Sequence, residues 1–113
     1  MTNMACLALI IAMEARNQND YTKSLVADIA IERAKVENVS ICSSMKKPKA
    51  YSWMWDGVNT KLTSDILMEA TKIARKELKS PIVTGRYFFN ECTLGRRYKT
   101  QYKMIRSEKL CFY

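Results

Sequence analysis

The stretch Met4 to Arg16, MACLALIIAMEAR, decides the fold, because it is an apolar helical segment that ends beside one carboxylate. Leu7, Ile10 and Ile11 have the spacing of residues on one face of a helix, and Glu14 is the next residue on that face. Apolar surroundings disfavour the ionised form of a glutamate and raise its pKa, so that it can donate a proton near neutral pH. The pattern therefore predicts a site that uses Glu14 as an acid. The alternative is that Glu14 reaches water at the last turn of the helix or pairs with an arginine.

The size and composition of the chain are those of one globular domain. Its 113 residues are 48% apolar and 27% charged, so we expect a single domain that spans residues 1–113. The apolar run from Met4 to Met13 has about half the length that a helix needs to cross a bilayer. No basic residue precedes this run and no cleavage site follows it, which predicts a chain with neither a signal peptide nor a membrane span.

The positive charge of the chain lies mainly in its C-terminal half. The net charge is +8, and residues 58–113 hold twelve Lys and Arg against five Asp and Glu, whereas residues 1–57 hold seven against six. A basic surface attracts polyanions, whether nucleic acid, teichoic acid, lipopolysaccharide or the carboxylates of peptidoglycan. The charge alone does not choose among these partners.

The chain has no histidine, and its cysteines do not have the spacing of a zinc site. Cys6, Cys42, Cys92 and Cys111 are too widely separated for a zinc finger or ribbon, so no metal site is expected. Without histidine, Ser-His-Asp and Cys-His chemistry are excluded, and carboxylates become the leading candidates for acid–base work. For the cysteines we expect small buried thiols in a reducing compartment in preference to disulfides.

Periodicity predicts two further helices. The second helix runs from about Thr22 to Val36, with its apolar residues toward the core and with Lys23 and Asp28 facing water. The third begins near residue 63 or 64 and ends before the proline at position 81. Between them no period persists, so residues 37–63 are predicted to form a long irregular lobe with short strands near residues 39–42.

Two aromatic segments are candidates for binding. The segment Tyr51 to Gly57, YSWMWDG, holds three aromatic rings and a carboxylate, and aromatic side chains with a polar rim bind the C–H faces of sugar rings. The alternative is that Trp53 or Trp55 anchors the core under a loop. The segment Tyr87 to Asn90 has the pattern of a half-buried strand. The amide of Asn90 suits an N-acetyl group or a sugar hydroxyl, and it could equally cap a turn.

The sequence from Glu14 to Arg33, EARNQNDYTKSLVADIAIER, resembles the opening motif of the SleB-like cell wall hydrolases. In that family Glu-Ala-Arg is followed by a loop and by a helix that ends in Asn-Arg-Val. The spacing here is the same, without a gap, but Glu32 and Ala34 replace the asparagine and the valine. Arg33 is therefore the residue that matches in the second half of the motif.

Two later segments and the end of the chain are similar to the same family. Tyr51 and Ser52 match a Phe-Ser or Tyr-Ser pair, and Tyr87 to Asn90 resembles a Tyr-Phe-Asn strand that follows a glycine-bearing turn. Leu110 to Tyr113 resembles the closing strand of the family, in which a histidine commonly stands at the place of Leu110. This departure weakens any role taken over for that position.

The resemblance implies an α+β, mainly α, lysozyme-like single domain with a minor strand element. It implies cleavage of the β-1,4 glycan of peptidoglycan, by a lytic transglycosylase or a muramidase-like hydrolase, with Glu14 as general acid and base and with no metal or organic cofactor. A hydrolase would need a second acid, for which Asp56 and Glu91 are the candidates. The residues expected to bind substrate are Tyr51, Ser52, Trp55, Tyr87, Phe89 and Asn90.

A wall hydrolase without an export signal must be released by another agent, and this predicts a phage endolysin. We expect a monomer that is made in the host cytoplasm, is released by a holin and then acts on the bacterial cell wall, with no specific nucleic acid partner. Two alternatives stay open. A basic nucleic-acid-binding module would explain the charge and the aromatic residues. A noncatalytic envelope or virion protein would bind glycan through the aromatic residues and would tolerate loss of Glu14.

Overall fold

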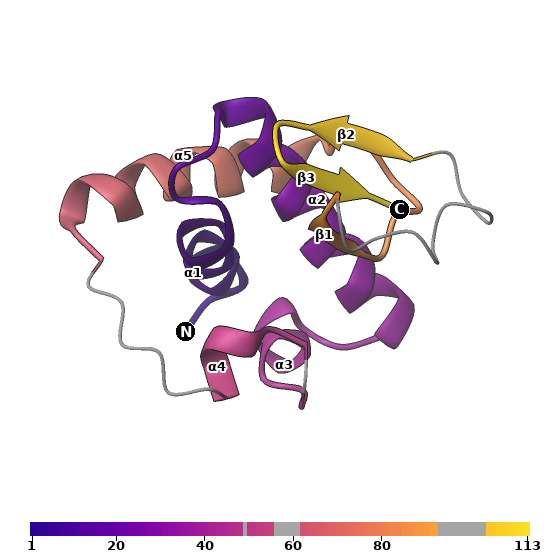
Figure 1. Ribbon diagram of the computed structural model, residues 1–113. Helices are drawn as coiled ribbons and strands as arrows, with labels where there is room; N and C mark the ends of the chain where they lie inside the picture. Colours follow the sequence, from indigo (N-terminus) through magenta and orange to yellow (C-terminus); the bar gives the residue numbers. More distant parts are fainter. Residues whose placement is uncertain (49, 56–61, 93–103) are drawn as a thin grey trace.

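Helices dominate the computed structural model, and one small antiparallel sheet follows them in the chain (Figure 1). Residues 1–48, 50–55, 62–92 and 104–113 are described, with Trp55 described by its backbone alone. The predicted class, α+β and mainly α with a minor strand element, is confirmed. The elements are α1 (Asn3–Ala15), α2 (Asp20–Glu37), α3 (Ile41–Met45), α4 (Ser52–Trp55), α5 (Ser64–Lys79), β1 (Phe89–Glu91), β2 (Ile105–Ser107) and β3 (Leu110–Phe112).

Helix α1 forms the centre of the molecule. The hydroxyl of Thr2 caps it by accepting a hydrogen bond from the Ala5 amide at 3.0 Å. Leu7, Ile10 and Ile11 are no more than 1% exposed, because α2, α3 and α5 all pack against α1 (Figure 1). The predicted inward face of this helix is therefore confirmed. In the described ranges, no helix is both long enough and apolar enough to span a bilayer.

Helix α2 is buried on more sides than the sequence predicts. The side chain of Asn19 caps its start, and Asn38 ends it in a left-handed conformation with φ of 56°. The sequence predicts that Lys23 and Asp28 face water, yet they are only 9% and 2% exposed. The prediction is wrong because α1, α3 and α5 all pack on α2, so that every residue from 22 to 30 is buried.

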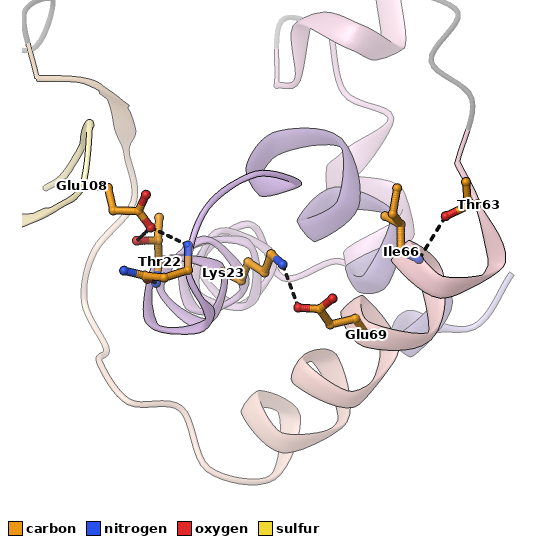
Figure 2. Close-up of polar contacts among 7 residues, drawn as sticks. Thr22, Lys23, Thr63, Ile66, Glu69 and Glu108 are labelled. Carbon is orange, nitrogen blue, oxygen red and sulfur yellow. Dashed lines mark hydrogen bonds and ion pairs between the residues drawn. The ribbon is translucent and has the colours of Figure 1, made fainter.

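An ion pair joins α2 to α5, and a hydroxyl cap fixes the start of α5 (Figure 2). Lys23 Nζ lies 2.9 Å from Glu69 Oε1, so the buried stem of the lysine carries its charge to a carboxylate at the surface. Thr63 Oγ1 accepts a hydrogen bond from the Ile66 amide at 3.3 Å. The predicted start of the third long helix is therefore confirmed, with Thr63 as its cap.

The described part of residues 37–63 contains two short helices, where the sequence predicts an irregular lobe with strands near residues 39–42. Helix α3 begins after Ser40, whose hydroxyl accepts a hydrogen bond from the Ser43 amide at 3.0 Å. Ile41 and Met45 lie one turn apart on this helix and are both buried in the core. The strand prediction is wrong because this cap and this helical spacing outweigh the β propensity of so short a segment.

The sheet has the strand order β1-β3-β2, and both pairs of strands are antiparallel. Phe112 on the central strand lies opposite Phe89 on one side and Ile105 on the other. The rings of Phe89 and Phe112 stack with their centroids 5.7 Å apart. The strands predicted within residues 87–90 and 110–113 are confirmed, although β1 begins only at Phe89.

The turn between β2 and β3 fastens the sheet to α2 (Figure 2). Glu108, with φ of 54°, accepts hydrogen bonds from the Asn19 amide and, at 3.4 Å, from the Thr22 hydroxyl. The hydroxyl oxygens of Thr22 and Ser107 also lie 2.5 Å apart. The end of the chain is therefore held on the start of α2, directly after the loop that follows α1.

All four cysteines form disulfides. Cys6 is bonded to Cys42 and joins α1 to α3, and Cys92 is bonded to Cys111 and joins the end of β1 to β3. The expectation of buried free thiols is therefore wrong. The partners are 36 and 19 residues apart in sequence, and they meet only because the fold packs α1 on α3 and pairs β1 with β3.

Two buried carboxyl groups meet between α2 and α5. Asp28 and Glu77 are 2% and 0% exposed and share a hydrogen bond. Asp28 Oδ2 also accepts the amides of Ile82 at 2.9 Å and Val83 at 3.0 Å, and Lys76 Nζ lies 3.3 Å from Glu77 Oε2. Burial first and Glu77 second raise the pKa of Asp28 to about 8. Asp28 therefore keeps its proton at neutral pH and donates it to Glu77.

We expect the free energy of unfolding to fall by up to about 1.4 kcal/mol per pH unit as the pH rises from about 5 to about 8. The native chain holds the Asp28 proton up to about pH 8, whereas the unfolded chain loses it near pH ~4, so unfolding releases a proton throughout this window. Asp28→Asn should flatten the slope, because its amide donates to Glu77 at every pH and its oxygen still accepts from Ile82 and Val83. Denaturant unfolding across this window measures the slope. The control Glu91→Gln changes an exposed carboxylate and should keep it, and an unchanged slope in Asp28→Asn would contradict the prediction.

Candidate active site

Glu14 lies in the last turn of α1, half-buried beside Trp53 of α4. The indole Nε1 of Trp53 donates a hydrogen bond to Glu14 Oε1 at 3.0 Å. Burial raises the pKa of Glu14, and this effect outweighs the Trp53 hydrogen bond and the charge of Arg33, which both lower it. The direction expected from the apolar helix face is confirmed, so the protonated form of Glu14 is more favoured than that of a glutamate in water.

Glu14 lines a hollow of about 300 Å³ at the end of α1. Met13, Arg16, Asn17 and Gln18 form the rest of its described wall. Arg16 Nη2 and Gln18 Oε1 are buried and have no hydrogen-bond partner within the residues that the structure describes. Buried polar atoms normally have partners, and at less than 1 Å² of accessible surface neither atom is open to a ligand in the hollow.

Arg33 joins three segments that are far apart in the chain. Its Nε donates a hydrogen bond to the Tyr87 carbonyl at 2.6 Å, and its Nη1 donates to the Ala50 carbonyl at 3.4 Å. Its guanidinium also lies 5.3 Å from the ring centroid of Tyr51 and 5.9 Å from that of Phe89. A residue that the sequence matched by spacing alone is therefore the connection between α2, the start of α4 and the segment that leads into β1.

Several residues that were predicted to bind substrate gather around Arg33. Tyr51 is only 2% exposed and belongs to the core, so it supports the site from beneath and does not line an open groove. Tyr87 and Phe89 are half-buried beside Arg33. Ser52 is exposed at the first position of α4. The three aromatic residues thus meet at Arg33, Tyr87 through its carbonyl oxygen and Tyr51 and Phe89 through their rings.

The remaining predicted residues have different outcomes. Asn90 is half-buried in β1, and its Oδ1 has no hydrogen-bond partner in the described part of the chain. Glu91 is exposed on the same strand and is not among the groups that act on Glu14. Asp56 lies outside the described residues, and the side chain of Trp55 is not described. Glu14 is therefore the carboxylate that the described part of the chain places at the hollow.

Sequence reasoning missed two residues beside Glu14. Trp53 was assigned either to an aromatic binding segment or to the core, and its contact with Glu14 depends on a helix of only four residues, Ser52–Trp55, too short for periodicity to predict. Gln18 belongs to a polar run that predicts a loop with capping residues, and Asn19 in that run does cap α2. The same polar run also contributes to the hollow, because Gln18 is one of its lining residues.

We expect Trp53→Phe to raise the pKa of Glu14 further, because the substitution keeps an aromatic ring but removes the donor to Oε1. The maximal rate of any reaction that uses Glu14 as an acid should fall less than about tenfold, since the acid itself is retained. A carbon NMR titration of the Glu14 carboxyl group measures the shift without an activity assay. Tyr21→Phe, at an exposed ring on α2, is the control. An unchanged or lowered pKa in Trp53→Phe would refute the role of this hydrogen bond.

The hollow combines one acid, one guanidinium and two amide side chains. Such a set can bind oxygen-rich ligands by hydrogen bonds, and the acid can also transfer a proton. Among known proteins, no family model matches the chain, and neither a curated protein nor a solved structure is found to be similar to it.

Proposed function

We propose that the protein is a peptidoglycan-degrading glycosidase that cleaves the β-1,4 glycan with Glu14 as general acid and base. The observation that carries this proposal is the half-buried Glu14, held by Trp53 at 3.0 Å and with its pKa raised, in the wall of a hollow of about 300 Å³. This volume is at the lower end of the range of about 300–1,000 Å³ that ligand sites occupy. A carboxyl group whose pKa is raised by burial is the kind of group that protonates a glycosidic oxygen.

In a lytic transglycosylase one carboxylate is sufficient. Protonated Glu14 would give its proton to the glycosidic oxygen as the bond to the muramoyl ring lengthens. The carboxylate would then take the proton of the muramoyl 6-hydroxyl group, which closes a 1,6-anhydro ring. Trp53 and Arg33 would stabilise the carboxylate between the two steps, since both lower the pKa of Glu14.

In a muramidase-like hydrolase a second carboxylate would act on water or on the sugar, at about 5 to 9.5 Å from the first. Asp56 and Glu91 are the candidates for that role. The described wall of the hollow holds Glu14 as its carboxylate, and Asp56 lies outside the described residues. The products distinguish the two routes, because one leaves anhydro ends and the other leaves reducing ends.

The contacts of Arg33 also support the proposal. The resemblance to the SleB-like hydrolases rests on three separated segments, and Arg33 contacts the second and third of them while its charge acts on Glu14 in the first. Chance similarity in three short segments gives no reason for them to meet. Their meeting at one side chain is expected if they belong to one site.

We also propose that the protein is a phage endolysin that acts on the cell wall after a holin opens the inner membrane. The proposal rests on the wall substrate and on the net charge of +8, which would draw a released protein to the anionic envelope. Expression in the bacterial cytoplasm followed by chloroform tests it. Turbidity should fall only after the membrane is permeabilised, and lysis before that point would contradict a holin-dependent release.

Mass spectrometry of digested peptidoglycan tests the enzymatic proposal. Anhydro-muramic ends would identify a lytic transglycosylase, and new reducing ends would identify a hydrolase. Intact glycan after long incubation with folded protein would overturn the glycosidase assignment.

A nucleic-acid-binding module is the rival, and the outer face of α5 favours it. Lys72, Arg75 and Lys79 are exposed there, and no ion pair involves them in the described ranges. Binding through phosphate contacts falls steeply with salt, whereas binding of a mainly neutral glycan does not. A shift assay with single-stranded DNA at low and moderate salt, beside a peptidoglycan pull-down, decides between them. Salt-sensitive DNA binding without glycan retention would favour the rival.

A further inference from the structure

A second hollow, of about 600 Å³, lies beside Arg33 and is separate from the hollow at Glu14. Its volume is within the range of sites that bind a ligand, about 300–1,000 Å³. Glu14 is not among its lining residues, so the proposed proton transfer does not account for it. Its wall comes from the end of α2, from α3, from the loop after α3 and from the segment before β1, and consists of Arg33, Val36, Glu37, Ser44, Lys47, Pro48, Ala50, Tyr87 and Phe88.

One wall of this hollow holds a fixed pair of opposite charges. Glu37 Oε1 accepts a hydrogen bond from Ser44 Oγ at 2.5 Å, and Glu37 Oε2 lies 2.7 Å from Lys47 Nζ. The side chains of Glu37 and Lys47 are nevertheless 29% and 45% exposed, respectively. Lys47 and Ser44 hold the pKa of Glu37 below its usual range, so the carboxylate is ionised at neutral pH. A carboxylate has about four acceptor sites, and both charged side chains keep exposed surface through which a ligand can reach them.

Part of the lining is apolar. Phe88 and Val36 are 44% and 63% exposed, and Pro48 and Ala50 also line the hollow. The ring of Phe88 faces Arg33, with 5.9 Å from its centroid to the guanidinium carbon. Such a wall suits a chain of methylene groups, because burying it gains free energy without requiring hydrogen bonds. The hollow therefore fits an aliphatic chain that ends in a group with both charges.

We propose that this hollow binds the peptide stem of peptidoglycan through a diamino acid whose side chain ends in a carbon bearing both an ammonium and a carboxylate, as in diaminopimelate. The ammonium binds Glu37, the carboxylate binds Lys47, and the methylene groups lie against Phe88 and Val36. The inference rests on the proposed function and adds the substrate class to it. It also predicts that the protein distinguishes between bacterial cell walls, because a peptide stem with lysine at this place has no carboxylate for Lys47 to bind.

Calorimetric or NMR binding of free tripeptide stems tests the site without any cleavage. The tripeptide ending in diaminopimelate should bind about tenfold more tightly than the tripeptide ending in lysine, because it makes one more charged hydrogen bond. Glu37→Gln and Lys47→Met should each weaken binding of the diaminopimelate peptide by about tenfold or more. Lys35→Gln is the matched control, because Lys35 is exposed on α2, the helix that carries Glu37, but does not line the hollow. The affinity of this variant for the diaminopimelate peptide should equal that of the wild type.

The outcomes separate this inference from the proposed function. Equal affinity for the two tripeptides, or unchanged affinity in both Glu37→Gln and Lys47→Met with normal circular dichroism, would overturn the stem site. If one variant fails to fold, the other still decides. Selective binding of the diaminopimelate peptide with intact glycan after incubation would support the stem site and overturn the glycosidase. Glycan cleavage without selective binding of the diaminopimelate peptide would support the glycosidase and overturn the stem site.

Discussion

Glu14→Gln is expected to lower glycan cleavage by about two to four orders of magnitude, the usual contribution of a general acid–base. The amide cannot give a proton to the glycosidic oxygen, and it cannot take one from an attacking hydroxyl group. Folding should be retained, because the amide oxygen can still accept the hydrogen bond from Trp53 and because no charge is left to bury. The rate of release of soluble fragments from purified peptidoglycan measures the loss.

The control for this experiment is Asp65→Asn, which changes an exposed carboxylate in the first turn of α5 and should keep the wild-type rate. A thermal melt of Glu14→Gln at or above that of the wild type would show that the loss is chemical. Cleavage within about threefold of the wild type would end the mechanism proposed for Glu14, since removal of a general acid costs at least about a hundredfold.

Loss of both disulfides is expected to lower the melting temperature by roughly 20 °C or more. The loops that Cys6–Cys42 and Cys92–Cys111 close span 36 and 19 residues, and the chain-entropy relation gives roughly 3 to 4 kcal/mol for each bond. Their sum is comparable with the whole stability of a small domain, about 5 to 15 kcal/mol. Scanning calorimetry with and without a strong reductant measures the difference.

Two double variants separate the contributions of the bonds. Cys6→Ser with Cys42→Ser should destabilise the protein somewhat more than Cys92→Ser with Cys111→Ser, because the first bond closes the longer loop. A melting temperature that reduction does not change would contradict the prediction. If the effect is as large as expected, the reduced chain is only marginally folded, and an oxidising environment would be needed to complete its folding.

The long helices could be predicted from sequence because their signals are local. The face of α1 and the cap of α5 at Thr63 follow from spacing and from side-chain chemistry. The burial of Lys23 and Asp28 could not be predicted from the periodicity of their own segment. It depends on how many helices pack on α2, which is a property of the whole fold. The disulfides were missed for the same reason, since tertiary packing alone brings their partners together.

The candidate site was predicted in part. The position of Glu14 and the direction of its pKa shift follow from the apolar face of α1. The donor Trp53 was missed because a four-residue helix has no period, and Tyr51 was expected in a groove although an aromatic ring can equally fill a core. The contacts of Arg33 join segments that are distant in the chain, so no local pattern in the sequence predicts them.

The way in which Arg33 binds its neighbours affects how this architecture can diverge in evolution. Its two hydrogen bonds end on the carbonyl oxygens of Ala50 and Tyr87, and every type of residue has a carbonyl. Position 50 can therefore drift while the connection persists, whereas position 33 needs the planar fork of an arginine, which lysine cannot reproduce. In a library of variants we expect substitutions at 50 to be tolerated and Arg33→Lys to be depleted, and the reverse pattern would refute this. Descendants of one ancestor could then keep the arrangement long after their sequences had ceased to look alike.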